Sequence, residues 1–411
     1  MRSSPYFSSS YRIDKFAIAL HNICMWIERN YLKLLRRNLT QFPVILLTGA
    51  RQVGKTSLLE KESSNFSFCS LEDPILAREA EEAPDIFFSK YRLPVIIDEV
   101  QYAPKFFRYI KLFVDKHKKK GQFALTGSQS FQLMQNVSES LAGRCGIITM
   151  SGISGLERRN NNLLFASIEV LLRGSYPELI ANKDFNKTDW YRSYIASYLE
   201  RDVRNILKVG DIRDFSTFLT AVVLRSGQIL SYSELARDVG IAVNTAKSWL
   251  SVLEASQVIY LLKPYYKNLG KRLFKSPKLY IRDTGLFCHL ANIQDSTALT
   301  YSPYIRAVWE TYVLNQTINS YQENGLNPNV WFWRTQSGQE VDFLIDTGGR
   351  LTAIEVKYFE KPNVEKTTKG YNSLKQFYGD KIIDKLIIVT TGKESHKIGK
   401  DIYIKSGWFW E

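Results

Sequence analysis

Residues Gly49 to Thr56 have the types and spacing of a phosphate-binding loop, G-x-x-x-x-G-K-[ST]. In such a loop the glycines let backbone N–H groups turn toward phosphate oxygens, and Lys55 would reach the β- and γ-phosphates. The Thr56 hydroxyl is suited to binding Mg²⁺. The motif therefore predicts ATP and Mg²⁺ as cofactors. We expect nine consecutive residues to contact the nucleotide or its metal: Gly49, Ala50, Arg51, Gln52, Val53, Gly54, Lys55, Thr56 and Ser57.

Two adjacent carboxylates, Asp98 and Glu99, follow the apolar run 94–97. Burying two carboxylates in the middle of a strand that is covered on both faces would have a large desolvation cost. At the carboxyl end of the strand this cost is small, because the pair there faces the ligand crevice. One acidic residue in this position often caps a helix. After a phosphate-binding loop, the pair instead indicates a Walker B motif. We expect Asp98 to hold Mg²⁺, and Glu99 to orient and deprotonate the attacking water.

Two further polar residues, Ser128 and Arg144, could contact the γ-phosphate. Ser128 follows the apolar run 123–126, which reads as another strand of the same sheet. It could equally be the N-cap of a helix. Arg144 could act on the γ-phosphate of its own or of a neighbouring subunit, or it could form a surface ion pair. Both alternatives remain open at this stage.

Near the carboxyl end, residues 340–345 and 352–357 read as two alternating strands with Gly348-Gly349 as the turn between them. Counting outward from that turn places Asp342 directly opposite Glu355. Like charges facing each other across a ladder destabilise it unless solvent or a cation intervenes. The register therefore predicts either a cation site or a solvated face of the hairpin.

The residue types around this pair match the D…E-x-K pattern of metal-dependent nucleases. Lys357 lies two residues beyond Glu355 and points to the same face. Asp342 and Glu355 would hold Mg²⁺, while Lys357 would stabilise the negative charge that develops on phosphate. Glu310, on a preceding predicted helix, could supply a third carboxylate to the metal.

Between these two sites, residues 233–240 and 245–255 read as two helices joined by a short turn, with strands at 258–262 and 279–281. This pattern is typical of a winged helix. The second helix would offer polar residues to the major groove of DNA, and the loop between the strands would offer basic residues to phosphate. Winged helices also serve as protein–protein modules. The residues concerned are Asn244, Thr245, Lys247, Ser248, Lys263, Lys267, Lys271, Arg272 and Lys275.

The chain resembles the bacterial and archaeal AAA-type ATPases that carry a C-terminal domain of unknown function, number 4143. The resemblance rests on GARQVGKTSLL, SLEDP, IIDEVQ, LTGSQS, SLAGR and RGSYPEL, and it continues through YLERDV, LARDVGIAVNTAKSWLSVLE, YIRDTGL and EVDFLID…AIEVK. It covers nearly the whole chain. It implies an α/β fold with a P-loop AAA-type domain, a winged-helix-like middle and a restriction-endonuclease-like, PD-(D/E)XK end.

These features divide the 411 residues into four predicted parts. Residues 1–24 are expected to be an N-terminal extension or a start-site error, because members of the resembled family commonly begin close to the P-loop helix. Residues 25–160 form the ATPase domain, 161–300 the helical connector and winged-helix-like domain, and 301–411 the nuclease-like domain.

The composition of the chain indicates which partners and which cellular compartment to expect. A net charge of +14 favours association with polyanions, nucleic acid first. The four cysteines lie far apart, which argues against a zinc site or a disulfide framework and fits a cytoplasmic protein. The apolar stretch 16–27 is too short for a membrane span, so we expect no membrane partner.

Two functions fit these patterns. The first is a Mg²⁺-dependent ATPase that acts with DNA through the middle and end domains, with hydrolysis coupled to the nuclease-like domain. The alternative is a nucleotide-dependent switch or assembly protein that binds a protein partner, with an inactive nuclease-like domain. A homo-oligomer is compatible with either function.

Overall fold

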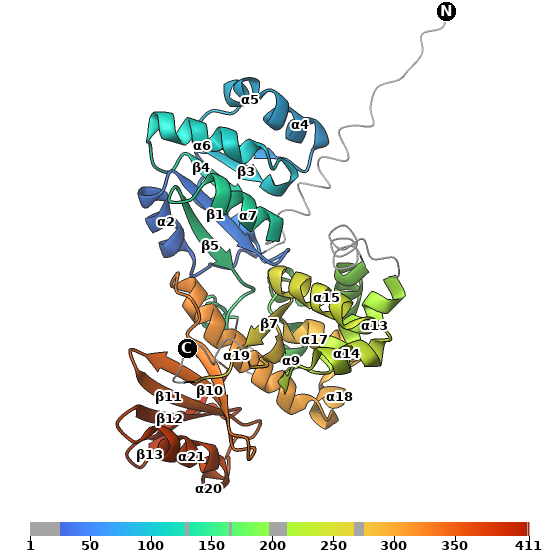
Figure 1. Ribbon diagram of the computed structural model, residues 1–411, viewed down its shortest axis with the longest axis vertical. Helices are drawn as coiled ribbons and strands as arrows, with labels where there is room; N and C mark the ends of the chain where they lie inside the picture. The colour runs from blue at the N-terminus through green and yellow to red at the C-terminus, as the bar shows by residue number, and fades with distance from the viewer. Residues whose placement is uncertain are drawn as a thin grey trace, which may run out of the picture.

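The computed structural model describes residues 25–127, 131–163, 167–196, 212–266, 275–408 and Trp410. The predicted extension 1–24 and Ser128 lie outside the described residues. Three sheets organise the part of the chain that is described (Figure 1). No helix in the described part of the chain is long and apolar enough to cross a membrane.

The first sheet is wholly parallel, with strand order β2-β3-β4-β1-β5. Its strands are β1 (Val44–Gly49), β2 (Ser67–Ser70), β3 (Val95–Asp98), β4 (Phe123–Thr126) and β5 (Cys145–Met150). The surrounding helices are α2 (Leu32–Gln41), α3 (Lys55–Glu62), α4 (Pro74–Glu82), α5 (Pro84–Lys90), η1 (Val100–Tyr102), α6 (Phe106–His117) and α7 (Phe131–Ser140).

Strand β1 is buried throughout, and its first four residues are apolar, because both faces of the sheet are covered. Ile45 and Leu47 belong to one core cluster, whereas Val44 and Leu46 belong to another on the opposite face. Side chains alternate across a strand, so a strand buried on both sides has no polar face and reads as a continuous apolar run. The parallel strands bring their carboxyl ends to one edge, where the P-loop and Asp98 meet.

The middle of the chain is helical around a three-stranded antiparallel sheet of order β6-β8-β7. The predicted helix pair is present as α14 (Tyr232–Val239) and α15 (Val243–Ala255). The second helix begins two residues earlier than expected. The bounds of all elements in this middle part of the chain follow. Its elements are α8 (Gly155–Asn160), α9 (Ile168–Arg173), α10 (Pro177–Ala181), α11 (Lys187–Tyr194), α13 (Ile212–Val223), β6 (Gln228–Ile229), α14 (Tyr232–Val239), α15 (Val243–Ala255), β7 (Ile259–Leu262), β8 (Lys278–Ile281), α17 (Thr284–Leu290) and α18 (Ser296–Tyr301).

The C-terminal part packs helices against a mixed sheet of order β13-β14-β12-β11-β10-β9. Strands β10 and β11 are antiparallel, and β11, β12 and β14 run parallel to one another. The elements are α19 (Ile305–Glu323), β9 (Val330–Arg334), β10 (Glu340–Thr347), β11 (Arg350–Val356), α20 (Val364–Thr367), α21 (Lys369–Tyr378), β12 (Ile383–Thr390), β13 (His396–Ile398) and β14 (Ile402–Ser406).

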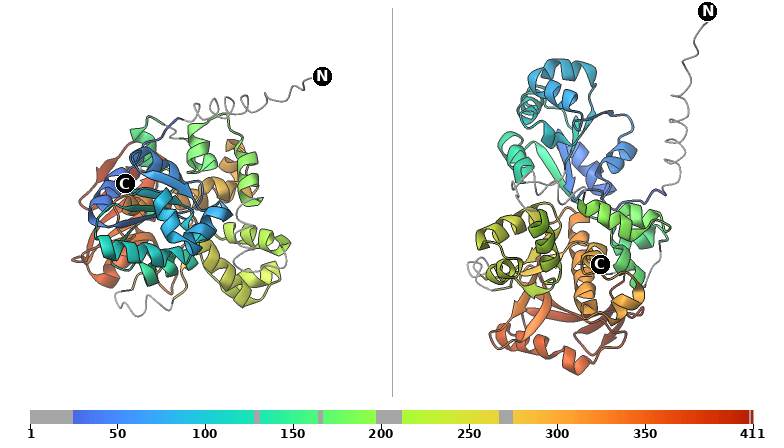
Figure 2. Two further views of the ribbon diagram at one scale, coloured as in Figure 1. Left: turned by 90° about the horizontal axis from the view of Figure 1, so that it is seen from above. Right: turned by 90° about the vertical axis from the view of Figure 1, so that its right-hand side faces the viewer.

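Helix α19 lies between the parallel sheet and the C-terminal sheet (Figure 1 and the right-hand view of Figure 2). The largest apolar cluster joins all three parts of the chain, with Ile45 from β1, Leu250 from α15 and Trp309 from α19. Because one core is shared, a displacement of α19 would disturb packing on both sides of it.

Polar contacts also tie the carboxyl end of α19 to the parallel-sheet domain. Asn30 Nδ2 donates to Glu323 Oε2 at 2.6 Å, and Glu157 lies close to this pair. Burial and the charge of Glu157 raise the pKa of Glu323 from 4.5 to about 7. Hydrogen bonds from Ser154 and Asn30 and the charge of Arg29 oppose the rise.

This shift predicts a pH dependence of stability. Between about pH 4.5 and 7 the folded chain holds a proton on Glu323 that the unfolded chain has released, so this group's contribution falls as pH rises. The loss reaches at most about 3 kcal/mol. Denaturant unfolding across this range should show that Glu323→Gln, which mimics the protonated carboxyl, removes that part of the slope. Identical pH profiles for the variant and the wild type would contradict the assignment.

Candidate nucleotide site and carboxylate cluster

The P-loop leads from β1 directly into α3 through a backbone that needs glycine. Gly49 has φ 140° and Gly54, the N-cap of α3, has φ 90°. A Cβ on Gly49 would lie 2.0 Å from the carbonyl oxygen of Met150, so the adjacent strand leaves no room for a side chain. The first amides of α3 therefore open into the loop, where helix-terminal N–H groups favour anions.

Lys55 lies inside this loop. Its side chain is buried, and Nζ donates to the carbonyl oxygens of Gly49 at 3.3 Å and Ala50 at 2.9 Å. Burial lowers the pKa of Lys55 to about 8, and the nearby charge of Glu99 offsets only part of this effect. A phosphate in the loop would give the ammonium a charged partner in place of two carbonyls, which is a stronger interaction.

The two halves of the predicted site are in contact. Thr56 Oγ1 donates to Asp98 Oδ1 at 2.6 Å, and Thr126 at the end of β4 donates to the same oxygen. A hydroxyl and a carboxylate are hard oxygen ligands of the kind Mg²⁺ prefers, and Mg²⁺ usually keeps several waters. Thr56 and Asp98 therefore fit a magnesium ion bound together with phosphates.

Glu99 is held at the start of η1 in the left-handed region, with φ 53°. Its backbone N–H donates to Thr126 Oγ1 at 3.2 Å, and its carboxylate accepts from the Gln101 side chain. A non-glycine residue in this conformation is strained, and such strain collects at functional sites. The turn directs Glu99 away from the strand axis while Thr126 fixes its backbone.

Thr126 and Gln101 were missed by the sequence reasoning. The expected contact of Ser128 with the γ-phosphate lies outside the described residues, whereas Thr126, two residues earlier, bonds to Asp98 and Glu99. A usable signal was present: Thr126, like Asp98, is a polar residue that ends an apolar strand.

Arg144 is not placed to act on the nucleotide of its own subunit. Gly49 pairs with Met150, the last residue of β5, whereas Arg144 precedes the first residue of that strand. The length of β5 therefore separates Arg144 from the P-loop by about 20 Å. Its guanidinium pairs with Asp115, with Nη2 donating to Oδ2 at 3.1 Å. The prediction of a contact within one subunit is thus corrected, because the strand carries the two groups to opposite edges of the sheet. A contact across subunits stays a prediction.

In the C-terminal sheet the strand register agrees with the expectation. Thr347 pairs with Arg350 and Phe343 with Ile354, and the regular pairing ends there, one position before Asp342 and Glu355. Lys357 Nζ lies 3.3 Å from an oxygen of Asp342 and 2.8 Å from one of Glu355.

The charges in this group compensate one another. Burial and the neighbouring Asp342 raise the pKa of Glu355 well above its ordinary value. Although burial disfavours the ammonium, Asp342 and Glu355 together raise the pKa of Lys357. The cation that the facing carboxylates require is therefore supplied by the chain itself.

Glu310 joins this cluster from α19 but is held by other partners. Its Oε1 accepts from the Tyr280 hydroxyl at 2.5 Å and lies 3.6 Å from Lys278 Nζ. Lys278 is buried and also donates to Glu340. Lys278, Tyr280 and Glu340 were missed by the sequence reasoning, because β8 reaches the cluster only through tertiary packing.

The expected metal site of Glu310, Asp342 and Glu355 is not formed. Within the described residues, no three or more His, Cys, Asp or Glu side chains are grouped so that they could hold a metal ion. The physical reason is that Lys357 lies between two of the carboxylates, while Lys278 and Tyr280 engage the third. In this arrangement lysines of the same chain form ion pairs with all three carboxylates.

Three parts of the chain match known protein families. Residues 41–158 match the family described as an AAA domain, residues 165–297 a domain of unknown function, DUF8612, and residues 306–408 a domain of unknown function, DUF4143. Uncharacterized proteins of Mycobacterium tuberculosis and Mycobacterium bovis are each 34% identical over 354 residues, which is 84% of this chain and 78% of theirs.

Among solved structures, a Walker-type ATPase of Pyrococcus abyssi, paby2304, is similar with a TM-score of 0.45 and 17% identity, over 65% of this chain and 96% of that one. A DNA replication initiation factor is similar with a TM-score of 0.26 and 15% identity, over 59% and 88%. Both scores lie below 0.5, so neither likeness bears on the assignment. The matched families and the mycobacterial relatives decide it: the chain belongs to the AAA-type ATPases that carry a C-terminal DUF4143 domain.

Proposed function

We propose that this chain binds and hydrolyses ATP with Mg²⁺ at the edge of its parallel sheet. The observation that carries the proposal is the contact between Thr56 and Asp98, which brings a P-loop and an acidic strand end together at 2.6 Å. Lys55 lies within the same loop and carries the positive charge that phosphates require.

The chain's own residues divide the work. The P-loop amides and Lys55 would bind and orient the phosphates, and Thr56 and Asp98 would hold the metal. Mg²⁺, when bound, supplies charge neutralisation of the β- and γ-phosphates. Glu99 would orient a water molecule and accept its proton at a carboxylate oxygen. The donor from Gln101 holds one oxygen of Glu99 and leaves the other for this task.

We further propose that the unit formed by α13, β6, α14, α15, β7 and β8 is a winged-helix-like module that binds DNA. Asn244, Lys247 and Ser248 are exposed on α15, whereas Trp249 and Leu250 are buried in the core. The exposed face is thus polar and basic, as a major-groove helix requires. Lys263 and Lys275 flank the loop at 267–274, which lies outside the described residues.

Steady-state ATP hydrolysis, measured with and without DNA, tests both the role of Glu99 and the proposed binding of DNA. Glu99→Gln keeps the size of the side chain but cannot accept the proton, so turnover should fall by about 10²–10⁴-fold while ATP still binds. Glu72→Gln, an exposed carboxyl after β2, should keep wild-type turnover. DNA should raise wild-type turnover, and more weakly as salt increases. Full turnover in Glu99→Gln would refute the assigned base. Turnover that ignores DNA would favour the second function below.

The second candidate is a nucleotide-dependent switch whose C-terminal domain binds a protein partner. The specific observation in its favour is the neutralised cluster, in which Lys357 bridges Asp342 and Glu355, and Lys278 pairs with Glu310 and Glu340. A nuclease of the D…E-x-K type needs those carboxylates for metal. Under this second function the nuclease-like domain would be inactive.

DNA incubated with the wild-type chain and Mg²⁺ should therefore stay intact on a gel. Cleavage that disappears in Asp342→Ala would overturn this expectation and establish the nuclease assignment. Asp384→Ala serves as the matched control, because that carboxylate lies on β12 of the same sheet and pairs with Arg350 at 3.8 Å and with Lys385 at 3.6 Å, outside the cluster.

A further inference from the structure

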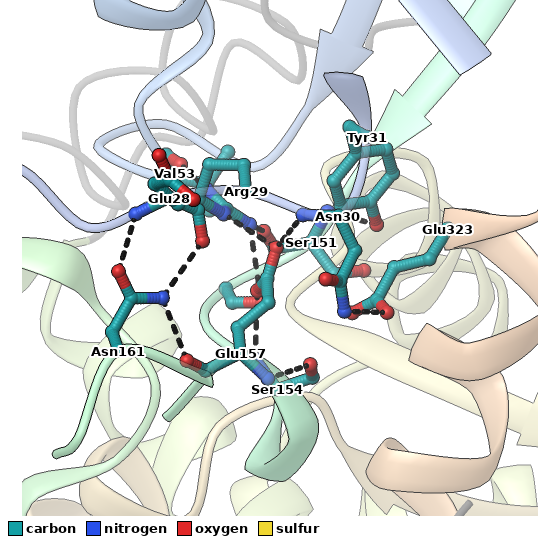
Figure 3. A network of polar contacts seen from close by, with 11 residues as sticks. Glu28, Arg29, Asn30, Tyr31, Val53, Ser151, Ser154, Glu157, Asn161 and Glu323 are labelled. Carbon is teal, nitrogen blue, oxygen red and sulfur yellow. Dashed lines mark hydrogen bonds and ion pairs between the residues drawn. The ribbon is translucent and has the colours of Figure 1, made fainter. Parts of the chain in front are cut away.

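The guanidinium of Arg29 lies directly against the outer side of the P-loop (Figure 3). It is 4% exposed, and each of its nitrogens has an acceptor. Nη1 donates to the Val53 carbonyl at 2.7 Å, Nη2 to the Ser151 carbonyl at 2.7 Å, and Nε to Glu157 Oε1 at 2.9 Å. Arg29 thus joins the P-loop, the end of β5 and helix α8.

The partner carboxylate is equally fixed. Glu157 is fully buried and closes the capping box of α8 by accepting from the Ser154 N–H at 3.0 Å. Its other oxygen accepts from the Asn30 N–H at 2.8 Å as well as from Arg29. Breaking a buried pair by removing one partner leaves an uncompensated charge, so both groups are held strongly in this geometry.

The bond to Val53 has a consequence for the inside of the loop. In a trans peptide the C=O and the following N–H point in opposite directions. Because the Val53 carbonyl is turned outward to Arg29, the N–H of Gly54 in the same peptide plane is turned inward, toward the phosphate side of the loop. Arg29 therefore fixes the direction of an amide that would bind phosphate.

Two residues beside this network, Asn30 and Ser151, contact α19. Asn30 Nδ2 donates to Glu323 Oε2 at 2.6 Å, and Ser151 Oγ donates to Gln322 Oε1 at 2.5 Å. Glu310, in the carboxylate cluster, lies thirteen residues earlier on this helix, about 20 Å along its axis. A continuous set of hydrogen bonds and one helix thus connect the P-loop to the C-terminal cluster.

We propose that Arg29 is a positioning residue of the nucleotide site and that it couples ATP binding to the carboxyl end of α19. An ATP molecule that requires the inward Gly54 amide favours the Arg29–Val53 bond, and with it the Asn30–Glu323 contact. By linkage, a partner that stabilises α19 strengthens ATP binding by the same factor. This inference rests on the ATP site of the proposed function.

A buried ion pair that only stabilises the fold makes different predictions. Its loss would lower the melting temperature but would not separate ATP affinity from the response of α19 to ATP. The readouts are therefore equilibrium binding of a non-hydrolysable ATP analogue with Mg²⁺, and hydrogen exchange of residues 316–323 with and without that analogue.

Arg29→Lys keeps the positive charge but cannot serve three acceptors at once. We expect its affinity for the analogue to fall by about tenfold, the effect of losing one charge-assisted hydrogen bond. The analogue should slow hydrogen exchange at 316–323 in the wild type and have less effect in the variant. Arg36→Lys is the matched control, since the exposed Arg36 pairs only with Glu62 and should keep wild-type affinity within about twofold.

A second variant removes the side-chain contacts between the Arg29 network and helix α19 and leaves the contacts of Arg29 with the P-loop in place. Asn30→Ala combined with Ser151→Ala removes both contacts to α19. It keeps every side-chain bond of Arg29, because Arg29 binds the backbone carbonyl of Ser151. Affinity should therefore stay within about threefold, while the slowing of exchange at residues 316–323 should be lost. If Arg29→Lys does not fold, Glu157→Gln replaces it, because an uncharged partner weakens the hold on Arg29.

Each result tests a separate part of the proposal. Wild-type affinity in Arg29→Lys, or in Glu157→Gln in its place, overturns the positioning role. Full nucleotide-dependent protection of α19 in the Asn30→Ala, Ser151→Ala double variant overturns the coupling. A wild-type chain that binds no ATP analogue overturns the proposed function, and this inference falls with it.

Discussion

The hydrogen bond between Thr56 and Asp98 joins residues 42 positions apart and sets the geometry of the nucleotide site. It exists because β1 and β3 are parallel members of one sheet and end at the same edge. Strand β3 is apolar until Asp98, since a carboxylate in its buried middle would cost several kcal/mol. The same rule places Thr126 at the end of β4. Three strand ends therefore supply the P-loop, the acidic pair and the hydroxyl that bonds to both members of that pair.

The parts of this arrangement that are local in sequence could be predicted. The P-loop needs only a strand, a glycine-containing turn and a helix in succession, and the register of β10 and β11 follows from the Gly348-Gly349 turn. Lys278 and Tyr280 could not be foreseen, because β8 pairs with β7 but places these side chains against a helix and a strand from the C-terminal part. The Arg144 interpretation failed in part because its motif was considered without the direction of β5, which carries it to the far edge of the sheet.

The C-terminal cluster illustrates how one pattern permits two outcomes. Facing carboxylates require a cation, and sequence spacing does not distinguish a bound metal from a lysine of the same chain. Here Lys357 and Lys278 meet that requirement, and both lie close enough to form ion pairs. Glu310 places this cluster at one end of α19, while Glu323 places the Arg29 network at the other. Helix α19 is thus the element through which an event at the P-loop can reach the C-terminal sheet.

The most direct test of this account is the affinity of Lys55→Ala for ATP and Mg²⁺, measured by calorimetry beside the wild type. Lys61→Ala, which removes an exposed lysine from the same helix, is the control. The account predicts tight binding in the wild type and in Lys61→Ala, and loss of binding in Lys55→Ala. Full-affinity binding in Lys55→Ala would contradict the assignment of the P-loop as the nucleotide site.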